Sequence, residues 1–340
     1  MALRDTHVTM AHGGGGRAMR DLIADVFTDV FQPPGHEDQA RLMHDAFQEP
    51  GARLAFTTDS FVVSPLEFPG GDIGKLAVCG TVNDLAVGGA RPLWLSAAFI
   101  IEEGCDIVLL RRIVATMAAE ARAAGVRIVT GDTKVVERGA ADGLFITTSG
   151  VGVIASGTDL GAGQFRAGDA VIVNGSLGDH GATIMAERGE FALQSALQSD
   201  CAALHDVMAA AMAAAPDLRA ARDCTRGGLA SALNELATDA GLGMVLDEAA
   251  LPLRDEVRGL CEILGLDPLY LANEGRLVCF TPPEQAQAVV SALQTLPEGQ
   301  GACIIGQVTD AHPGQVRMQG LFGGARIVDM LVGDQLPRIC

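Results

Sequence analysis

Two successive blocks of alternating strand and helix patterns constrain the fold of this chain more than any other feature. Between residues 155 and 168 the sequence shifts to Gly, Ser, Ala and Thr, and the apolar spacing loses its regularity. At 340 residues the chain is also longer than one small core normally holds. We therefore expect an α/β (α+β) protein with domains at 1–155 and 165–328, followed by a mobile tail at 329–340.

Apolar periodicity predicts the elements of each half. Asp72 is a candidate helix cap. Helical spacing indicates helices over 17–31, 72–87, 107–124, 181–188, 201–214, 228–240, 253–264 and 283–293. Short apolar runs indicate strands over 53–59, 92–101, 126–130, 144–154, 170–173, 243–246, 276–280 and 302–308. Each half therefore mixes strands with helices.

The chain is strongly acidic, with 42 Asp and Glu against 24 Lys and Arg and a net charge of −18. Such a surface repels nucleic acid and anionic membranes, because affinity for either depends on neutralising phosphate charge. A nucleotide remains compatible with it, since Mg²⁺ can bridge phosphates to carboxylates. The chain starts without a secretory pattern and contains no apolar run long enough to span a bilayer. We therefore expect a cytoplasmic protein whose eight cysteines are thiols.

A glycine run, Gly13–Gly16, follows His12 and precedes the first predicted helix. Glycines let backbone N–H groups turn toward a ligand, and a helix N-terminus favours anions, so the run is a candidate phosphate loop. A flexible N-terminal loop is an equally good interpretation of the run alone. It is not a Walker A loop, because the only comparable Gly-Lys pair, Gly74-Lys75, is followed by Leu76.

Four carboxylates stand at strand ends or within apolar sequence: Asp59, Asp84, Asp132 and Asp223. A carboxylate buried without a partner costs several kcal/mol, so each needs a cation or a donor. Taken singly, Asp223 could be a helix N-cap and Asp84 could make a buried hydrogen bond. Taken together, the four predict a site for Mg²⁺ and phosphate, because Mg²⁺ prefers oxygen ligands.

Three further residues carry reactive groups. Lys134 follows Asp132 and could stabilise phosphate charge or act as a base, although a solvated loop lysine fits its position equally well. Glu274 precedes an apolar strand and could be a base or a turn residue. Cys340 carries a thiol on the tail, and a thiol with a pKa near 8.5 is partly thiolate at neutral pH. The position of Cys340 could also be accidental.

Read together, these stretches resemble the PurM-like ATP-binding superfamily. The resemblance is carried by His12–Gly16, Thr58-Asp59 with Pro65, Asn83-Asp84 with 89–92, Gly131–Thr133, and Asp223 with 227–229. Within that superfamily, Pro337–Cys340 and Asn273–Gly275 resemble the HypE family of hydrogenase maturation proteins. Selenophosphate synthetases differ by a Cys or selenocysteine near the N-terminal glycines, where this chain has Ala11-His12.

The resemblance implies two PurM-like domains, with the N-terminal domains pairing in a homodimer and ATP near the interface. It implies ATP-dependent dehydration of an S-carbamoyl group on Cys340 to a thiocyanate, which supplies a cyanide ligand of nickel–iron hydrogenase. The maturation protein HypF would donate the carbamoyl group, and a HypC–HypD complex would accept the cyanide.

By the same resemblance, three carboxylates hold Mg²⁺ and two residues remove the amide protons. The metal ligands would be Asp59, Asp84 and Asp223, and the nucleotide site would contain His12, Gly13, Gly14, Gly15, Gly16, Asn83, Gly131, Asp132 and Thr133. Lys134 and Glu274 would take the protons, in an order the sequence leaves open. Two alternatives remain at this point: an enzyme acting on a small free substrate, and a non-catalytic scaffold that docks maturation partners.

Overall fold

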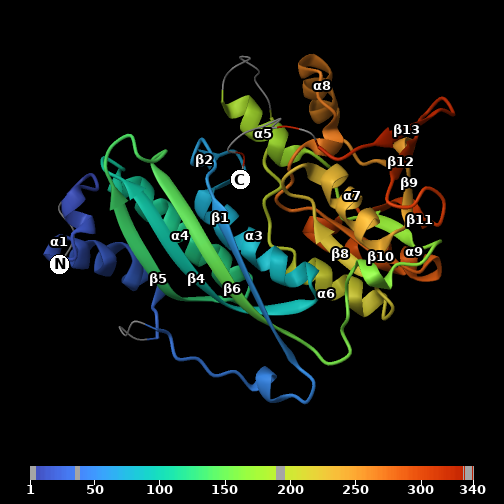
Figure 1. Ribbon diagram of the computed structural model, residues 1–340. Coiled ribbons are helices and arrows are strands. Elements are labelled where there is room, and N and C mark those ends of the chain that lie inside the picture. Colours follow the sequence, from blue (N-terminus) through green and yellow to red (C-terminus); the bar gives the residue numbers. More distant parts are fainter. Residues whose placement is uncertain (1–4, 35–38, 189–195, 332, 334–338, 340) are drawn as a thin grey trace.

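Two β-sheets, each covered by helices, form the two halves of the molecule (Figure 1). This computed structural model describes residues 5–34, 39–188, 196–331, 333 and 339. The first sheet has the strand order β1-β6-β4-β5, with the bounds β1 (Arg53–Phe61), β4 (Ala90–Glu102), β5 (Arg127–Val136) and β6 (Leu144–Ile154). All its neighbouring strands are antiparallel except β4 and β5, which run parallel.

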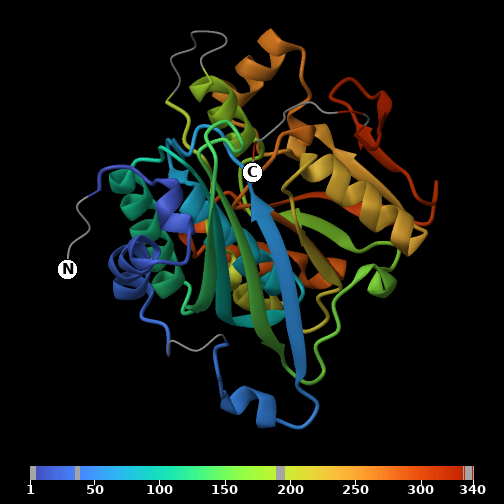
Figure 2. The same ribbon diagram turned by 60° about the vertical axis from the view of Figure 1, so that its left-hand side comes forward.

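One face of this sheet packs on two helices, α3 (Ile73–Val87) and α4 (Ile107–Ala123), and forms the N-terminal core. Alternate residues of β4, Leu95, Ala97 and Phe99, point into that core, as the period of two in a strand requires. The opposite face exposes Leu54 and Phe56 of β1. Figure 2 shows β1 at the near edge of the sheet with its outer side uncovered by the described helices.

The second sheet has seven strands in the order β13-β12-β9-β11-β7-β10-β8. Their bounds are β7 (Ala170–Val173), β8 (Ala220–Asp223), β9 (Gly243–Asp247), β10 (Leu277–Thr281), β11 (Cys303–Thr309), β12 (Val316–Gln319) and β13 (Ala325–Val328). Helix α7 (Gly228–Ala240) covers one face, and α6 (His205–Ala214) with α9 (Pro283–Leu293) covers the other. Because both faces are covered, all four residues of β7 are buried.

The remaining elements are short. A 3-10 turn at Met10–Gly13 leads into a helical segment made of α1 (Arg17–Leu22), a π-helical part (Ile23–Thr28) and α2 (Asp29–Phe31). A two-stranded ribbon, β2 (Glu67–Phe68) with β3 (Gly71–Asp72), precedes α3. Helices α5 (Asp179–Glu187) and α8 (Asp255–Leu264) complete the second half.

Helix α3 joins the two halves. Thirteen of its fifteen residues are buried, because it lies between the first sheet and the second domain. The Asn83 carboxamide crosses that joint: its Nδ2 donates to the carbonyl of Ala202 (3.0 Å), and its Oδ1 accepts from the N–H of Leu204 (2.7 Å). Helices of the described residues are all too short or too polar to cross a membrane.

Most of the predicted elements are confirmed. Helices α7 and α9 have the predicted bounds, and the Asp72 carboxylate caps α3 by accepting from the N–H of Lys75 (2.8 Å). Helix α6 begins at His205, four residues later than predicted. The four-residue strands β8, β12 and β13 were not predicted, because their apolar runs are too short to stand out from loops.

Two strands extend furthest beyond their predicted ends, and the other predicted strand ends agree within two residues. Strand β1 continues to Phe61 and β5 continues to Val136, so Asp59, Asp132 and Lys134 lie within strands and not at their ends. Asp132 and Lys134 are exposed and Thr133 between them is buried, because one side of the sheet is uncovered. This alternation over 132–134 is typical of a half-exposed strand and not of a loop.

Candidate active site

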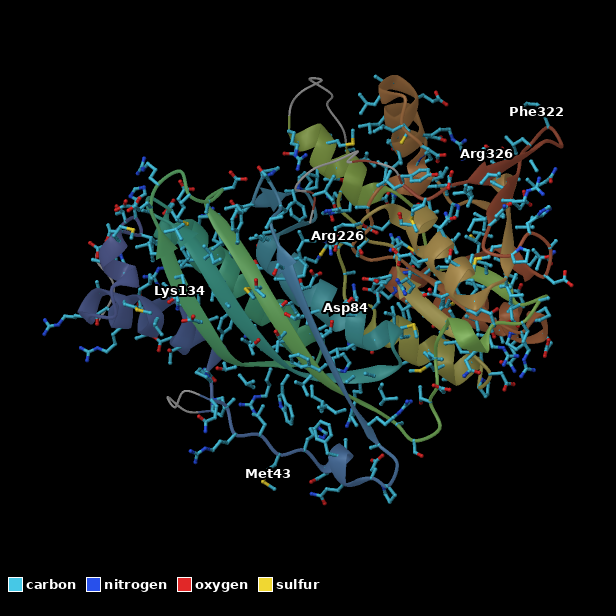
Figure 3. All side chains as sticks on the ribbon, in the orientation of Figure 1. Met43, Asp84, Lys134, Arg226, Phe322 and Arg326 are labelled. Carbon is cyan, nitrogen blue, oxygen red and sulfur yellow. The ribbon has the colours of Figure 1, made fainter. Side chains whose placement is uncertain are left out.

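Three carboxylates predicted to bind metal come together where the domains meet. Asp59 lies on β1, Asp84 on α3 and Asp223 at the end of β8. Thr57, two residues before Asp59 on the same side of β1, donates its hydroxyl hydrogen to Asp84 Oδ2 (2.7 Å). A guanidinium nitrogen of the exposed Arg226 lies 4.0 Å from Asp59 Oδ1. Figure 3 shows Arg226 and Asp84 in the middle of the molecule, between the two halves.

The mutual repulsion of these carboxylates is visible in their pKa values. Burial raises the pKa of Asp84, the hydrogen bond from Thr57 opposes that rise, and the charge of Asp59 adds to it. Burial raises the pKa of Asp223 to about 7, and the charge of Asp84 contributes in the same direction. The surrounding cations therefore do not fully offset the carboxylates. A cation bound here would lower the pKa values of both Asp84 and Asp223.

The carboxylates are grouped without forming a preorganised cage. Within the parts of the chain that the structure describes, no three His, Cys, Asp or Glu side chains converge closely enough to hold a metal ion by themselves. Mg²⁺ usually keeps several waters and takes only one or two carboxylates plus phosphate oxygens. A loose group of carboxylates therefore fits Mg²⁺ that is bound together with a phosphate.

The N-cap interpretation of Asp223 is wrong, because α7 begins after Gly227 without a side-chain cap. The buried hydrogen bond predicted for Asp84 is confirmed.

The glycine run lies against strand β5. A Cβ on Gly13 would stand 2.9 Å from the Cβ of Val135, so this close approach needs a glycine. Around Gly14, Gly15 and Gly16 there is much more room. The ring of His12 is fully buried: its Nδ1 accepts from the N–H of Thr9 (3.0 Å), and its Nε2 lies 3.3 Å from Asp5 Oδ2. The buried His12 ring therefore stabilises the conformation of the loop.

Strand β5 presents the other predicted residues on two sides. Asp132 and Lys134 are exposed and form an ion pair on the uncovered face. Thr133 is buried, and its hydroxyl has no hydrogen-bond partner within the described residues. A cavity of about 420 Å³ lies beside this strand, with Phe27 and Phe99 among the apolar residues that line it. Gly131, Asp132 and Thr133 supply polar groups to the same cavity.

Within one chain, the carboxylate group around Asp59 and the predicted residues of β5 lie far apart. Asp59 and Gly131 stand on one row of the sheet, which runs through Thr148 of β6 and Ala97 of β4. Because β1 and β5 are the two edges of the sheet, the backbones at Asp59 and Gly131 are three strand spacings apart, or about 14 Å. The hydroxyl of Thr57 reaches α3, so Asp59, with the same parity on β1, faces the helices, whereas Lys134 faces the uncovered side. Figure 3 shows Lys134 over β5, well away from Asp84.

A third group lies at the domain joint beside the tail. Glu274 is almost fully buried in the loop before β10, and its N–H donates to Asp200 Oδ1 (3.1 Å). Ile339 is only 5% exposed and packs in the N-terminal core, and its carbonyl lies 2.7 Å from Nε2 of the buried His180. Cys340, with Pro337 and Arg338 before it, lies outside the described residues. His180 lies in the first turn of α5.

Two contributions to the site were missed in the sequence. The signal for Thr57 is its spacing of two from Asp59, which places both side chains on one face of a strand. Asp200, whose carboxylate accepts from the N–H groups of Glu274 and Gly275, follows a stretch without periodicity and gives no comparable signal.

Comparisons with known proteins assign the class of the chain. Residues 37–154 match the N-terminal domain of the AIR synthase related proteins, and residues 166–319 match their C-terminal domain. Together with the two-sheet architecture, these matches define a two-domain protein of the PurM-like fold, as predicted.

Within that class the relatives are more specific. The carbamoyl dehydratase HypE of Rhodobacter capsulatus is 73% identical over 340 residues, covering 100% of both chains. A crystal structure of the hydrogenase maturation protein HypE in complex with ATP is 46% identical, covers 98% of this chain and 99% of its own, and has a TM-score of 0.92. A HypE–HypF complex matches with 42% identity and a TM-score of 0.80, covering 91% of this chain and 99% of that one. The chain belongs to the HypE family of carbamoyl dehydratases.

Proposed function

We propose that the chain dehydrates an S-carbamoyl group on Cys340 to a thiocyanate at the expense of ATP, and so supplies cyanide for nickel–iron hydrogenase maturation. The observation that carries the proposal is the burial of Ile339 between the two domains, with its carbonyl on His180. Ile339 is joined by one peptide bond to Cys340, so the chain binds the residue next to the proposed carrier between its two domains, as it would bind a substrate. Membership of the HypE family supports the same activity.

The proposed reaction balances in two steps. The carbamoyl oxygen attacks the γ-phosphorus of ATP and one N–H proton leaves, which gives an O-phosphorylated imidate and ADP. Loss of the second N–H proton then forms the C≡N bond as the C–O bond breaks and phosphate departs. Phosphorylation is needed because an amide oxygen is a poor leaving group, and catalysis of such a transfer depends chiefly on positioning and charge neutralisation.

Asp59, Asp84 and Asp223 are proposed to hold Mg²⁺ with the phosphates, in accordance with the raised pKa values of Asp84 and Asp223, which a bound cation would lower. When bound, Mg²⁺ would offset negative charge on the transferring phosphoryl group. Gly13–Gly16 are proposed to bind phosphate through their N–H groups, with the His12 ring supporting the loop. Asn83 stays a prediction for the nucleotide site, and its bonds to Ala202 and Leu204 suit it to holding the domains in register.

The cavity beside β5 is proposed to take the nucleoside of ATP. Its size lies within the range of ligand pockets, and it combines apolar walls with the buried hydroxyl of Thr133, which has no hydrogen-bond partner among the described residues. The ATP complex of a 46% identical HypE supports a nucleotide site in this chain.

A homodimer through the uncovered face of the first sheet is part of the proposal. Leu54 and Phe56 expose 63% and 67% of their surface there, and Ile100 exposes 41%. A flat apolar sheet face of this kind is typical of a protein interface. Since Lys134 lies on the same face and Glu274 lies at the domain joint, we assign Glu274 to the tail of its own chain. Lys134 is assigned to a site that the second copy completes.

Two further partners are proposed. HypF is the proposed carbamoyl donor, supported by the 42% identical HypE–HypF complex. A HypC–HypD complex is proposed as the cyanide acceptor, on the family resemblance alone. The cytoplasm is the proposed location, in agreement with the acidic composition and the cysteine content.

The test is an intact-mass measurement on protein carbamoylated at the Cys340 thiol with cyanate. Incubation with Mg²⁺ and ATP should remove the mass of one water, and peptide mapping should place the loss on Cys340. Samples without ATP and the Cys340→Ala variant should show no loss. ATP hydrolysis with an unchanged carbamoyl mass would favour an enzyme acting on a small free substrate. If neither ATP hydrolysis nor dehydration occurs, the chain acts as a scaffold.

A further inference from the structure

His180 makes a contact with the tail that the proposed reaction does not use. Its side chain is completely buried, with Nε2 lying 2.7 Å from the carbonyl oxygen of Ile339 and Nδ1 lying 2.8 Å from Ser199 Oγ. Both ring nitrogens are therefore engaged, one by the body of the second domain and one by the tail. No other described side chain hydrogen-bonds to Ile339.

The partners determine the tautomer of the ring. A carbonyl oxygen only accepts, so Nε2 of His180 carries the hydrogen. Nδ1 then accepts from the hydroxyl of Ser199, whose oxygen accepts in turn from the N–H of Cys201 (3.1 Å). Burial lowers the pKa of His180, which keeps the ring neutral and preserves this direction of bonds. At its last step, the hydrogen-bond chain donates from Nε2 of His180 to the backbone carbonyl of Ile339.

The surroundings hold the ring in place. His180 lies in the first turn of α5, and a Cβ on the next residue, Gly181, would stand 3.1 Å from the backbone nitrogen of Ala272. This close approach presses α5 against the loop that carries Glu274. On the other side, the ring of Phe68 meets the imidazole edge-on, with centroids 5.5 Å apart. A ring confined in this way cannot follow the tail when it moves.

A purely structural histidine would hydrogen-bond to the core of its own domain. The partner here is the backbone of the residue that precedes Cys340, and the side chain of that residue packs in a cluster formed mostly by the N-terminal core, to which Ile184 and Ala272 of the second domain also contribute. If the tail leaves, the Nε2–H of His180 loses its acceptor inside a buried site, which is unfavourable. The contact therefore favours the bound tail.

We propose that His180 is a positioning residue that latches the tail inside the enzyme by donating a hydrogen bond to the Ile339 carbonyl. The inference rests on the proposed function, in which Cys340 carries the carbamoyl group. Because the latch recognises the main chain, it holds the free thiol, the carbamoyl form and the thiocyanate alike. It sets the fraction of time for which the tail is bound, and the chemistry is left to other groups.

The test compares alkylation rates of Cys340 by iodoacetamide, followed by peptide mass spectrometry on the full-length protein without ATP. His180→Leu removes the donor and should raise the rate about tenfold, which corresponds to about 1.4 kcal/mol. His180→Gln keeps an N–H donor at the end of the side chain and should remain near the wild-type rate. His205→Gln, at the start of α6, is the control histidine and should change nothing.

Unchanged alkylation in a folded His180→Leu protein would overturn the latch. If that variant does not fold, Ser199→Ala provides the second test: it leaves His180 in place but removes the hydroxyl that holds the ring through Nδ1, and it should raise the rate severalfold. An unchanged rate in Ser199→Ala would then overturn the latch.

The alkylation test is independent of the proposed activity, because it needs neither ATP nor a carbamoyl group. A faster rate in His180→Leu together with no dehydration by wild-type protein would leave the latch standing and refute the dehydratase. Suppose instead that the wild-type protein dehydrates the carbamoyl group, and that His180→Leu matches it in single-turnover rate and in alkylation rate. The dehydratase would then stand and the latch would be refuted.

Discussion

The hydroxyl of Thr57 on β1 donates a hydrogen bond of 2.7 Å to the carboxylate of Asp84 on α3. The bond ties the edge strand of the first sheet to the helix that joins the domains, and it lowers the pKa of Asp84 against the effect of burial. Because it stabilises the ionised form of a proposed metal ligand, it links the fold of the N-terminal domain directly to ion binding.

Replacing Thr57 should therefore weaken binding of Mg²⁺-ATP without unfolding the protein. Thr57→Val removes the donor and should lower the affinity about five- to tenfold, equivalent to about 1 kcal/mol for a lost hydrogen bond to a charged group. Isothermal titration calorimetry with Mg²⁺-ATP measures the effect. Thr57→Ser keeps the donor and serves as the control, so equal losses in both variants would rule out the hydrogen bond as the cause.

Asp223→Asn should stabilise the protein without Mg²⁺ while abolishing its activity. The pKa of Asp223 is raised to about 7 in the folded chain, well above its value in an unfolded chain, so its ionisation destabilises the fold. The gain should be about 1 kcal/mol at a pH of about 8, reduced because the side chain is only half-buried. Urea unfolding measures it, and a less stable variant would contradict the argument.

The same shift makes a prediction about pH. A carboxyl whose folded pKa is raised contributes no penalty below a pH of about 4, a penalty that grows between about 4 and about 7, and a constant penalty above that. The stability difference between Asp223→Asn and wild type should therefore be smallest at about pH 4, increase through about pH 5 and 6, and reach its full size at about pH 8. Added Mg²⁺ should raise the melting temperature of wild type more at the higher pH. A difference that is independent of pH would show that Asp223 does not ionise in this range.

Phe56→Glu should produce a monomer and reduce activity. The substitution places a charge in the uncovered sheet face where Phe56 is 67% exposed, and burying that charge at an interface is costly. Ile263→Glu on α8 starts from the same exposed fraction and should leave both assembly and activity unchanged. Light scattering after size-exclusion chromatography gives the mass. A variant that stays dimeric would mean that another surface mediates the assembly.

Alkylation of the native protein should be selective for Cys340. Burial raises the pKa of Cys105 and Cys261 to about 11 and that of Cys279 to about 12, and it raises those of Cys201 and Cys224 as well. Thiols held protonated react slowly, because the thiolate is the nucleophile. Peptide mapping after brief exposure to iodoacetamide should find Cys340 modified first. Early modification of Cys201 would indicate that the domain joint opens.

Local patterns predicted the longer elements, but they missed three short strands and the ends of two others. The helix over 228–240 was predicted with its observed bounds, because its apolar stripe and flanking glycines are local signals. Strand β5 was predicted to end at 130 and ends at Val136, because its length depends on pairing with β4 up to Glu102. Strand pairing involves residues far apart in the sequence, so one strand read alone does not reveal it.

The sequence by itself determined the longer helices and strands, the two domains, the family, and the identities of the carboxylates, the glycine run and the tail cysteine. Tertiary structure alone decided which of them meet. Asp59, Asp84 and Asp223 converge because α3 docks the second domain against β1, while Lys134 lies on the other side of the sheet because of its position on β5. His180 reaches Ile339 across 159 residues of chain. Burial patterns record which side of an element is covered, but only long-range packing decides what covers it.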